Sequence, residues 1–436
     1  MQCNRLEKNT GRTIEQRLLT IVAIVAASGL MGGRPVSSQQ KPGGNEQVIY
    51  NFQSTEGQIG SWGTVISDAA GNLYGTTTPD GGGTVFELSP QSGGGWTQTT
   101  LYTFESFQDP EGQLAIDSAG NLYGTTSNNP GNIFELSPIS GGGWTYTSLY
   151  SFGAPGYFPQ AGVSLDAAGN IYGTTTRGGY TSGLCYPDGC GTVFELSLQS
   201  GGQWTYKTLY EFDGEIESTP LCKPVFDSAG NLYGTTSVSA GSEVTGTVFE
   251  LSPQLDGTWV EKVIHAFIDD TPDEGSPQSG VVFDGAGNLY GTVGNGGQFT
   301  DGIVYELRLQ PDGHWSETIL HNFQRNGVDG VYPQAVPVFD TAGNLYGTTA
   351  AGGSGPGCND HGCGTVYELR PKSGGGWSER ILHSFHDHHP EDGAVPAASG
   401  VVFGLNGSLY GTTFYGGVGI CTSGDFGCGT VYQIAP

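Results

Sequence analysis

Carboxylates recur in one kind of loop along this chain of 436 residues. The loop acids that could contact a ligand are Asp269, Asp270, Asp329 and Asp392. Carboxylate oxygens bind Ca²⁺, accept hydrogen bonds from sugar hydroxyls and, in suitably spaced pairs, hydrolyse glycosidic bonds. No Asp-x-Asp-x-Asp-Gly calcium loop is present, and among 42 acidic residues no pair is singled out. We therefore prefer a solvated acidic face, predict no catalytic residue and no cofactor, and keep Ca²⁺ as the alternative.

Cysteines form three close pairs, each in an equivalent loop. These pairs are Cys185 with Cys190, Cys358 with Cys363, and Cys421 with Cys428. Close pairing in an exported chain predicts three local disulfides. Zinc is the competing interpretation, but C-x4-C and C-x6-C are poor zinc spacings. Cys222 has no evident partner, and we expect a buried thiol there.

Histidines cluster near the C-terminal end, in the segment 383–389. Imidazoles this dense could bind a transition metal. His383 takes the place of a repeated tyrosine, as His265 and His321 do, so we expect these three to be structural. A polar exposed loop is preferred to a metal site for the others, which are His386, His388 and His389.

Aromatic side chains in the variable loops are the second group of candidate ligand contacts. They are Tyr157, Phe158, Tyr180, Tyr186, Tyr332 and Tyr415. Such rings provide platforms on which sugars stack, so we predict carbohydrate contacts there, chiefly at Tyr157, Phe158, Tyr332 and Tyr415. The aromatic residues of the repeated motifs are expected to form the core instead.

The composition excludes several classes of protein. Gly accounts for 76 residues without a Gly-X-Y period, aromatic residues make up 11% and charged residues only 13%. Collagen, a disordered chain and a helical bundle are therefore unlikely matches, whereas short strands joined by tight turns fit. The net charge of −27 would repel a phosphate backbone or an anionic membrane surface. Nucleic acid is not expected as a partner.

The N-terminal residues have the layout of an export signal. An apolar run over 18–27 is followed by small residues. The basic residues ahead of it are Arg5, Lys8, Arg12 and Arg17. The run is too short for a stable anchor, so no membrane span is predicted in the mature chain, and an uncleaved anchor is the alternative. We assign 1–38 to a signal peptide and short linker, and expect a secreted protein, with the periplasm as the other destination.

The rest of the chain repeats itself seven times. The hexapeptide Asn-Leu-Tyr-Gly-Thr-Thr, with small variations, starts at Asn72, Asn121, Asn170, Asn231, Asn288, Asn344 and Ser408. A Gly-Thr-Val-Phe-Glu-Leu motif follows each copy. A third motif, which ends in Leu/Ile-Tyr/His-x-Phe, opens at Trp96, Trp144, Trp204, Trp259, Trp315 and Trp377. Successive hexapeptides lie 49 to 64 residues apart.

Each repeat predicts four short strands: the Leu-Tyr-x-Phe segment, an apolar piece such as 280–283, the hexapeptide, and the Gly-Thr-Val-Phe-Glu-Leu motif. The apolar piece and the hexapeptide are joined by Asp-x-Ala-Gly-Asn. Its Asp caps its own turn and its Gly accepts a positive φ, so a hairpin is expected. Seven such units predict an all-β fold, a seven-bladed β-propeller of four-stranded antiparallel blades over 46–436. An open solenoid is the alternative.

The ends of the chain favour a closed ring. The last strand motif stops just before Pro436, without the Trp segment expected next. The segment 48–52 is the tail of that missing piece. It either completes the last blade or opens the first, and the sequence does not choose between the two.

These motifs resemble those of the choice-of-anchor tandem repeat GloVer-containing proteins, which are secreted bacterial proteins. The opening Asp-Gly-x-x-Pro of the family repeat is matched at 329–333 and 392–396, and the resemblance covers 46–436. The family implies a β-propeller-like repeat protein and no settled activity. Its members commonly end in an anchoring segment, which does not follow Pro436 here, so free secretion is expected.

We expect a secreted β-propeller that acts as a binding or interaction module, with an extracellular polysaccharide or a surface protein as partner. An extracellular carbohydrate-active hydrolase or lyase that uses loop carboxylates is the alternative, and a structural protein of the envelope is a third interpretation. An enzyme should release products from a polysaccharide, whereas a binding module should bind saturably without product.

Overall fold

The computed structural model describes most of residues 46–436. The residues outside the described part are 1–45, 54–62, 79–81, 106–107, 128–130, 154–156, 238–242, 269–274, 356, 359–360, 387–391, 397–399 and 419–426. The predicted signal peptide and linker lie among them. The described residues include one short 3₁₀ helix, η1 (Gly183–Cys185), and no helix of theirs is long and apolar enough to cross a membrane.

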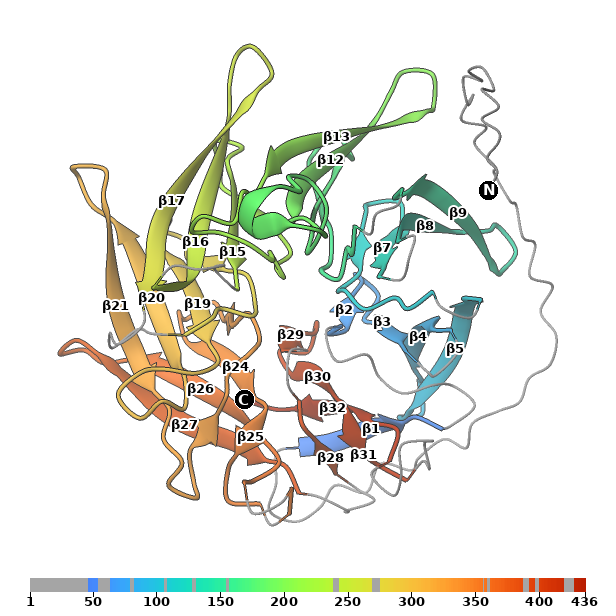
Figure 1. Cartoon of the computed structure of the whole chain (residues 1–436). Coiled ribbons are helices and arrows are strands. Elements are labelled where there is room, and N and C mark those ends of the chain that lie inside the picture. Colours follow the sequence, from blue (N-terminus) through green and yellow to red (C-terminus); the bar gives the residue numbers. More distant parts are fainter. Residues whose placement is uncertain are drawn as a thin grey trace, which may run out of the picture.

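Seven four-stranded antiparallel sheets form the blades of a β-propeller, which confirms the predicted fold class (Figure 1). The innermost strands are β2 (Ile66–Ser67), β6 (Ala115–Ile116), β10 (Ser164–Leu165), β14 (Val225–Phe226), β18 (Val282–Phe283), β23 (Val338–Phe339) and β29 (Val401–Phe403). The hexapeptide forms the second strands, which are β3 (Leu73–Thr77), β7 (Leu122–Thr126), β11 (Ile171–Thr175), β15 (Leu232–Thr236), β19 (Leu289–Val293), β24 (Leu345–Thr349) and β30 (Leu409–Thr413).

The other two motifs form the outer half of each blade. The third strands are β4 (Thr84–Pro90), β8 (Asn132–Pro138), β12 (Thr192–Leu198), β16 (Val244–Pro253), β20 (Ile303–Leu309), β26 (Thr365–Pro371) and β32 (Thr430–Ile434). The outermost strands are β5 (Trp96–Thr103), β9 (Trp144–Ser151), β13 (Trp204–Glu211), β17 (Trp259–Ile268), β21 (Trp315–Asn322), β27 (Trp377–Ser384) and β1 (Glu46–Asn51). Blade 1 contains β2–β5, blade 7 contains β29, β30, β32 and β1, and the others follow in chain order.

The N-terminal strand completes the last blade. β1 pairs antiparallel with β32 and lies beside it as the outer strand of blade 7 (Figure 1). The Phe52 N–H donates to the carbonyl oxygen of Gly429 at 3.1 Å, and the Phe52 ring lies 5.0 Å from the Phe86 ring of blade 1. Ser67 of blade 1 donates to the Phe403 carbonyl of blade 7 at 3.4 Å. The ring is therefore closed, and the first of the two positions allowed for 48–52 is the one observed.

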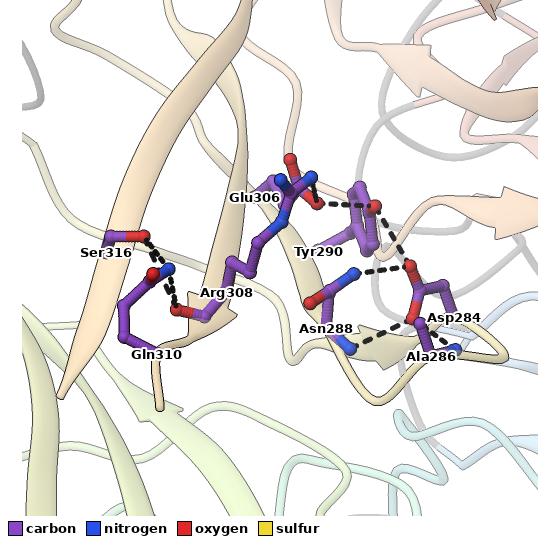
Figure 2. Close-up of polar contacts among 8 residues, drawn as sticks. All are labelled: Asp284, Ala286, Asn288, Tyr290, Glu306, Arg308, Gln310 and Ser316. Atoms are coloured by element: carbon purple, nitrogen blue, oxygen red, sulfur yellow. Dashed lines mark hydrogen bonds and ion pairs between the residues drawn. The ribbon is translucent and has the colours of Figure 1, made fainter. Parts of the chain in front are cut away.

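The Asp-x-Ala-Gly-Asn segment forms the predicted hairpin (Figure 2). In blade 5, Asp284 Oδ1 accepts the backbone N–H groups of Ala286 (2.8 Å) and Asn288 (2.9 Å), and the glycine between them has a φ of 88°. The Tyr290 hydroxyl lies 3.1 Å from Asp284 Oδ2 and 2.9 Å from Glu306 Oε1 on the third strand. The same turn recurs at Asp68, Asp117, Asp166, Asp227 and Asp340.

The core lies between blades and is built from the aromatic residues of the motifs, as predicted. The Tyr290 ring of blade 5 lies 4.8 Å from Phe339 and 6.4 Å from Trp377 of blade 6. An aromatic side chain of each third strand is fully buried: Phe86, Phe134, Phe194, Phe249, Tyr305, Tyr367 and Tyr432. This aromatic side chain lies against the glycine of the hexapeptide on the neighbouring strand. In blade 5, a Cβ at Gly291 would stand 2.4 Å from the Tyr305 hydroxyl oxygen. Only glycine fits there.

Two kinds of loop lie at one end of the blades, which we call the loop face. One enters each innermost strand and the other joins the second strand to the third. In blades 6 and 7 the two kinds pair as small sheets, β22 (Gly330–Val331) with β25 (Ala351–Gly352) and β28 (Gly393–Ala394) with β31 (Tyr415–Gly416). Residues of both loop kinds are thereby held close to the same opening of the ring.

The cysteine predictions are confirmed at the described positions. Disulfides join Cys185 to Cys190 and Cys358 to Cys363, in loops between a second and a third strand. Cys428 is also disulfide-bonded, while Cys421 lies outside the described residues. Cys222 is a buried free thiol, and burial raises its pKa to about 11. It is therefore inert at neutral pH.

Candidate functional site

A cavity of about 250 Å³ lies at the centre of the ring. All seven blades contribute to it, because the residues that enter the innermost strands converge there. Valines and small residues form much of its wall. The polar side chains that line it are Thr64, Gln113, Gln160, Lys223, Gln278, Ser279 and Gln334. A concave site with a few convergent polar groups is the usual form of a small-ligand site, so this cavity is the candidate functional site.

Lys223 is the one charged side chain among the described residues that line the cavity. Its Nζ donates to Gln113 Oε1 at 3.3 Å, across the entry to blade 3. Burial lowers the pKa of Lys223 to about 8, because the ammonium loses hydration there. At neutral pH the cavity still holds a positive charge, although the chain as a whole carries −27.

The glutamines provide both hydrogen-bond donors and acceptors to the cavity. Gln160, Gln278 and Gln334 each follow a proline at the end of a loop on the loop face. Gln160 Nε2 also donates to Glu111 Oε2 at 3.2 Å, and burial raises the pKa of Glu111. Glutamine amides arranged around a cavity can exchange hydrogen bonds with a hydroxyl-rich ligand.

Two of the predicted aromatic contacts lie next to these glutamines in the chain. Phe158 precedes Gln160 by two residues and is half-buried, with the Arg177 guanidinium 4.8 Å from its ring centre. Tyr332 precedes Gln334 by two residues and is 37% exposed. Its hydroxyl accepts a hydrogen bond from Arg325 Nη2 at 2.9 Å. Phe158 and Tyr332 therefore stand on the loops that lead into the cavity.

The other predicted aromatic contacts are less directly connected to the cavity. Tyr157 is half-buried and packs on Phe152, with ring centres 5.7 Å apart. Tyr415 is half-buried on β31 and packs on Phe414 at 4.6 Å. Tyr180 and Tyr186 are exposed, 47% and 77%, on the loop of the first disulfide. These residues lie on the loop face, and none of them lines the cavity.

The predicted loop acids that the structure describes do not line the cavity. Asp329 and Asp392 are buried between blades. Asp329 Oδ2 lies 3.3 Å from His321 Nε2. Asp392 Oδ1 lies 3.1 Å from His383 Nε2, and its Oδ2 lies 2.8 Å from His386 Nδ1. The predicted acids Asp269 and Asp270 lie outside the described residues, as do His388 and His389.

The histidines at the repeated tyrosine position do pack as structural residues. His265, His321 and His383 each lie edge-on to the phenylalanine two residues later, at 4.6 to 4.7 Å between ring centres. His386 was expected in an exposed polar loop, but it is half-buried and bonded to Asp392. The spacing of the histidines did not reveal this contact with Asp392.

A further acidic cluster lies between blades 3 and 4. Thr247 Oγ1 donates to Glu217 Oε1 at 2.7 Å, and the Tyr210 hydroxyl lies 3.4 Å from Glu261 Oε2. Burial, together with the nearby Glu261 carboxylate, raises the pKa of Glu217 to about 8. The pair therefore retains a proton at neutral pH.

We expect Glu217→Gln to stabilise the protein at alkaline pH and not at pH 5. The Glu217 pKa is higher in the folded than in the unfolded chain, so its contribution to stability is lost as pH rises from about 4.5 to 8. The amide keeps the oxygen that Thr247 bonds. Thermal unfolding should show a midpoint about 2–4 °C above wild type at pH 8.5. Glu215→Gln, an exposed acid in the same loop, is the control, and an equal gain at both pH values would contradict the prediction.

Sequence reasoning missed the cavity residues. The signal that could have found them is the Pro-Gln step, repeated at 159–160, 277–278 and 333–334. Lys223 stands four residues before the turn Asp227, at a position that is Gly162 or Gly280 in neighbouring repeats. A lysine at a position of small residues was the second signal.

A repeat model described as the Gloeobacter/Verrucomicrobia repeat matches the chain three times, over residues 27–186, 127–284 and 225–436. The chain belongs to this repeat family. The resemblance drawn from the motifs is thereby confirmed. Each match of the Gloeobacter/Verrucomicrobia repeat spans about three blades, and together the matches include all seven hexapeptides.

Solved structures show a distant similarity to this Gloeobacter/Verrucomicrobia repeat protein. A protein from Lactobacillus plantarum has a TM-score of 0.49 and 15% identity over 77% of this chain and 85% of its own. A putative 6-phosphogluconolactonase from Bacteroides uniformis has a TM-score of 0.46 and 14% identity over 76% and 85%. A puromycin-hydrolyzing peptidase from Mycobacterium tuberculosis has a TM-score of 0.49 and 12% identity over 87% and 52%. The comparison with curated proteins gave no match.

Proposed function

We propose that this protein is an extracellular binding module that takes the end of a saccharide chain into the central cavity, with Lys223 opposite an acidic group of the terminal sugar. The observation that carries the proposal is the single positive side chain among the glutamines of the cavity wall. Amide groups serve sugar hydroxyls as donors and acceptors, and an ammonium binds a carboxylate with a charge-assisted hydrogen bond.

The size of the cavity and the charge of the chain limit the ligand. A cavity of about 250 Å³ lies at the small end of ligand sites and accommodates about one sugar ring. The net charge of −27 disfavours a polyanion, whereas one carboxylate can be neutralised locally by Lys223. Tyr332 and Phe158 on the adjoining loops would contact the next sugars of the chain.

The extracellular setting is supported by the disulfides and by the predicted export signal. Disulfides persist in oxidising compartments, and two are formed within the described residues. An extracellular saccharide is therefore accessible to the loop face. A surface protein remains the other class of partner that the sequence indicated.

The test is a calorimetric titration of the full chain with a disaccharide that ends in glucuronic acid. Its methyl ester and the corresponding glucose-terminated disaccharide are the two matched controls. We expect saturable binding of the acid and at least tenfold weaker binding of both controls. Equal binding of acid and ester would overturn the role of the charge, and binding of none of the three would overturn the saccharide proposal. Release of monosaccharide would indicate the hydrolase alternative instead.

A further inference from the structure

The interface between blades 5 and 6 holds polar side chains where other interfaces hold stacked tyrosines. At the equivalent positions, Tyr102 stacks on Tyr146 with ring centres 4.4 Å apart. Between blades 5 and 6 the two positions are His321, on β21, and Glu379, on β27. Asp329, which comes from the loop entering blade 6, joins them. A packed aromatic pair is thus replaced by an imidazole and two carboxylates.

These three side chains converge on one point. His321 Nε2 lies 3.3 Å from Asp329 Oδ2 and 3.5 Å from Glu379 Oε1, and all three groups offer ligand atoms within 4.8 Å of one another. Ligands held at 2.0–2.2 Å around a tetrahedral ion stand about 3.4 Å apart. The two shorter distances therefore match those of neighbouring ligands on a common metal ion.

Buried oxygen atoms of this cluster have no hydrogen-bond partner. The Asp329 side chain is 9% exposed, and its Oδ1 is among the buried atoms without a partner. The hydroxyl of Tyr367, which interacts electrostatically with Glu379, is in the same condition, whereas Glu379 Oε1 contacts His321 Nε2. Buried polar atoms are almost always satisfied, so such a group calls for an absent partner. A partner that binds carboxylate oxygens and an imidazole nitrogen together is a cation.

We propose that His321, Asp329 and Glu379 bind one divalent transition-metal ion, for which Zn²⁺ is the best match, and that this ion joins blade 5 to blade 6. Zn²⁺ accepts imidazole nitrogen and carboxylate oxygen as ligands, whereas Ca²⁺ prefers oxygen ligands alone. The ion would also fix the start of the loop that carries Tyr332 and ends at the cavity. This inference does not depend on the proposed saccharide.

The interface between blades 6 and 7 carries a related cluster, and its capacity to bind metal must be removed in the test. His383, His386 and Asp392 also offer three ligand atoms within 4.8 Å. Both oxygens of that carboxylate already contact imidazole nitrogens, so the proposal is confined to the first cluster. His386→Ala removes one of its ligands and provides the background for the experiment.

The interface between blades 3 and 4 supplies a natural control variant. There Tyr210 and Glu261 stand at the positions of His321 and Glu379, and Glu217 of the entering loop supplies the second carboxylate. A tyrosine thus replaces the histidine, and the fold accommodates it. His321→Tyr copies that arrangement. It removes the nitrogen ligand while retaining an aromatic ring that packs between blades. Asp329→Asn is the second variant, and it leaves the shape of the site unchanged.

The experiment titrates Zn²⁺ into the chelator-treated full chain in the His386→Ala background, followed by calorimetry and thermal unfolding. We expect His321→Tyr and Asp329→Asn each to lose one equivalent of Zn²⁺, or to weaken its binding at least tenfold. Zn²⁺ should raise the unfolding midpoint of the background but not of either variant. In chelator all three should unfold cooperatively, which shows that the variants fold. Equal stoichiometry and equal shifts in all three would overturn the site, and a larger shift with Ca²⁺ than with Zn²⁺ would overturn the assigned metal class.

Discussion

Phe52→Ala should lower the free energy of unfolding by about 3–5 kcal/mol, as large-to-small substitutions in a packed core do. Phe52 is fully buried and packs on Tyr50 and Phe86, each at 5.0 Å between ring centres. Because Phe86 belongs to blade 1, the cavity left by the substitution lies at the contact that closes the ring. Chemical denaturation monitored by tryptophan fluorescence measures the loss.

Phe323→Ala is the matched control for this prediction. Phe323 has the equivalent place after the outer strand of blade 5, is also fully buried, and packs on Tyr367 at 5.2 Å. Both variants lose the same side chain, but only Phe52→Ala loosens a strand whose pairing partner lies some 380 residues away. Limited proteolysis should therefore cut near β1 in Phe52→Ala and not in Phe323→Ala. Equal cutting near β1 in both variants would contradict the closing role of β1.

Lys223→Met should weaken binding of the glucuronic acid ligand by about 10- to 100-fold. A hydrogen bond to a charged group is worth about 1.5–3 kcal/mol, which corresponds to that range. Methionine has a similar length and no charge, so we expect an unchanged or higher unfolding midpoint. Lys262→Met, an exposed lysine on β17, is the control and should bind like wild type.

The same variant gives a characteristic pH dependence. Binding of a carboxylate requires the protonated lysine, and burial lowers the Lys223 pKa to about 8. Wild-type affinity should therefore fall as pH rises from 7 to 9.5, whereas the affinity of Lys223→Met should stay flat over that range. A wild-type profile as flat as that of the variant would contradict the assignment of Lys223 to the ligand.

The fold could be predicted because the same strand and turn motifs recur along the seven repeats of the sequence. Strand motifs, the Asp turn and the glycine under each third-strand aromatic are local features, and each is visible in one repeat. The phase of the blades could not be predicted, because it depends on the pairing of β1 with β32 at opposite ends of the chain. The motif tail at 48–52 marks a strand of the repeat, but it does not tell the last blade from the first.

The candidate site was predicted only in part, for a related reason. Tyr332 and Phe158 stand out as aromatic residues in loops, and each lies two residues before a glutamine that lines the cavity, although neither lines it. The cavity itself takes between one and five residues from each of seven blades, so no single segment displays it. Likewise Asp329 meets a glutamate 50 residues later, and that contact exists only when two blades face each other.

The closure of blade 7 also determines when the molecule can be completed during synthesis. The segment of β1 leaves the ribosome first among the blade strands and its partner β32 leaves last. Blades 1 to 6 consist of consecutive strands and can assemble in order, while β1 must wait unpaired until the C-terminus arrives. Such long-range pairing slows folding and exposes a free strand edge in the meantime. The pairing of β1 with β32 is therefore the last step of folding, and it also covers the strand edge through which the nascent chain could aggregate.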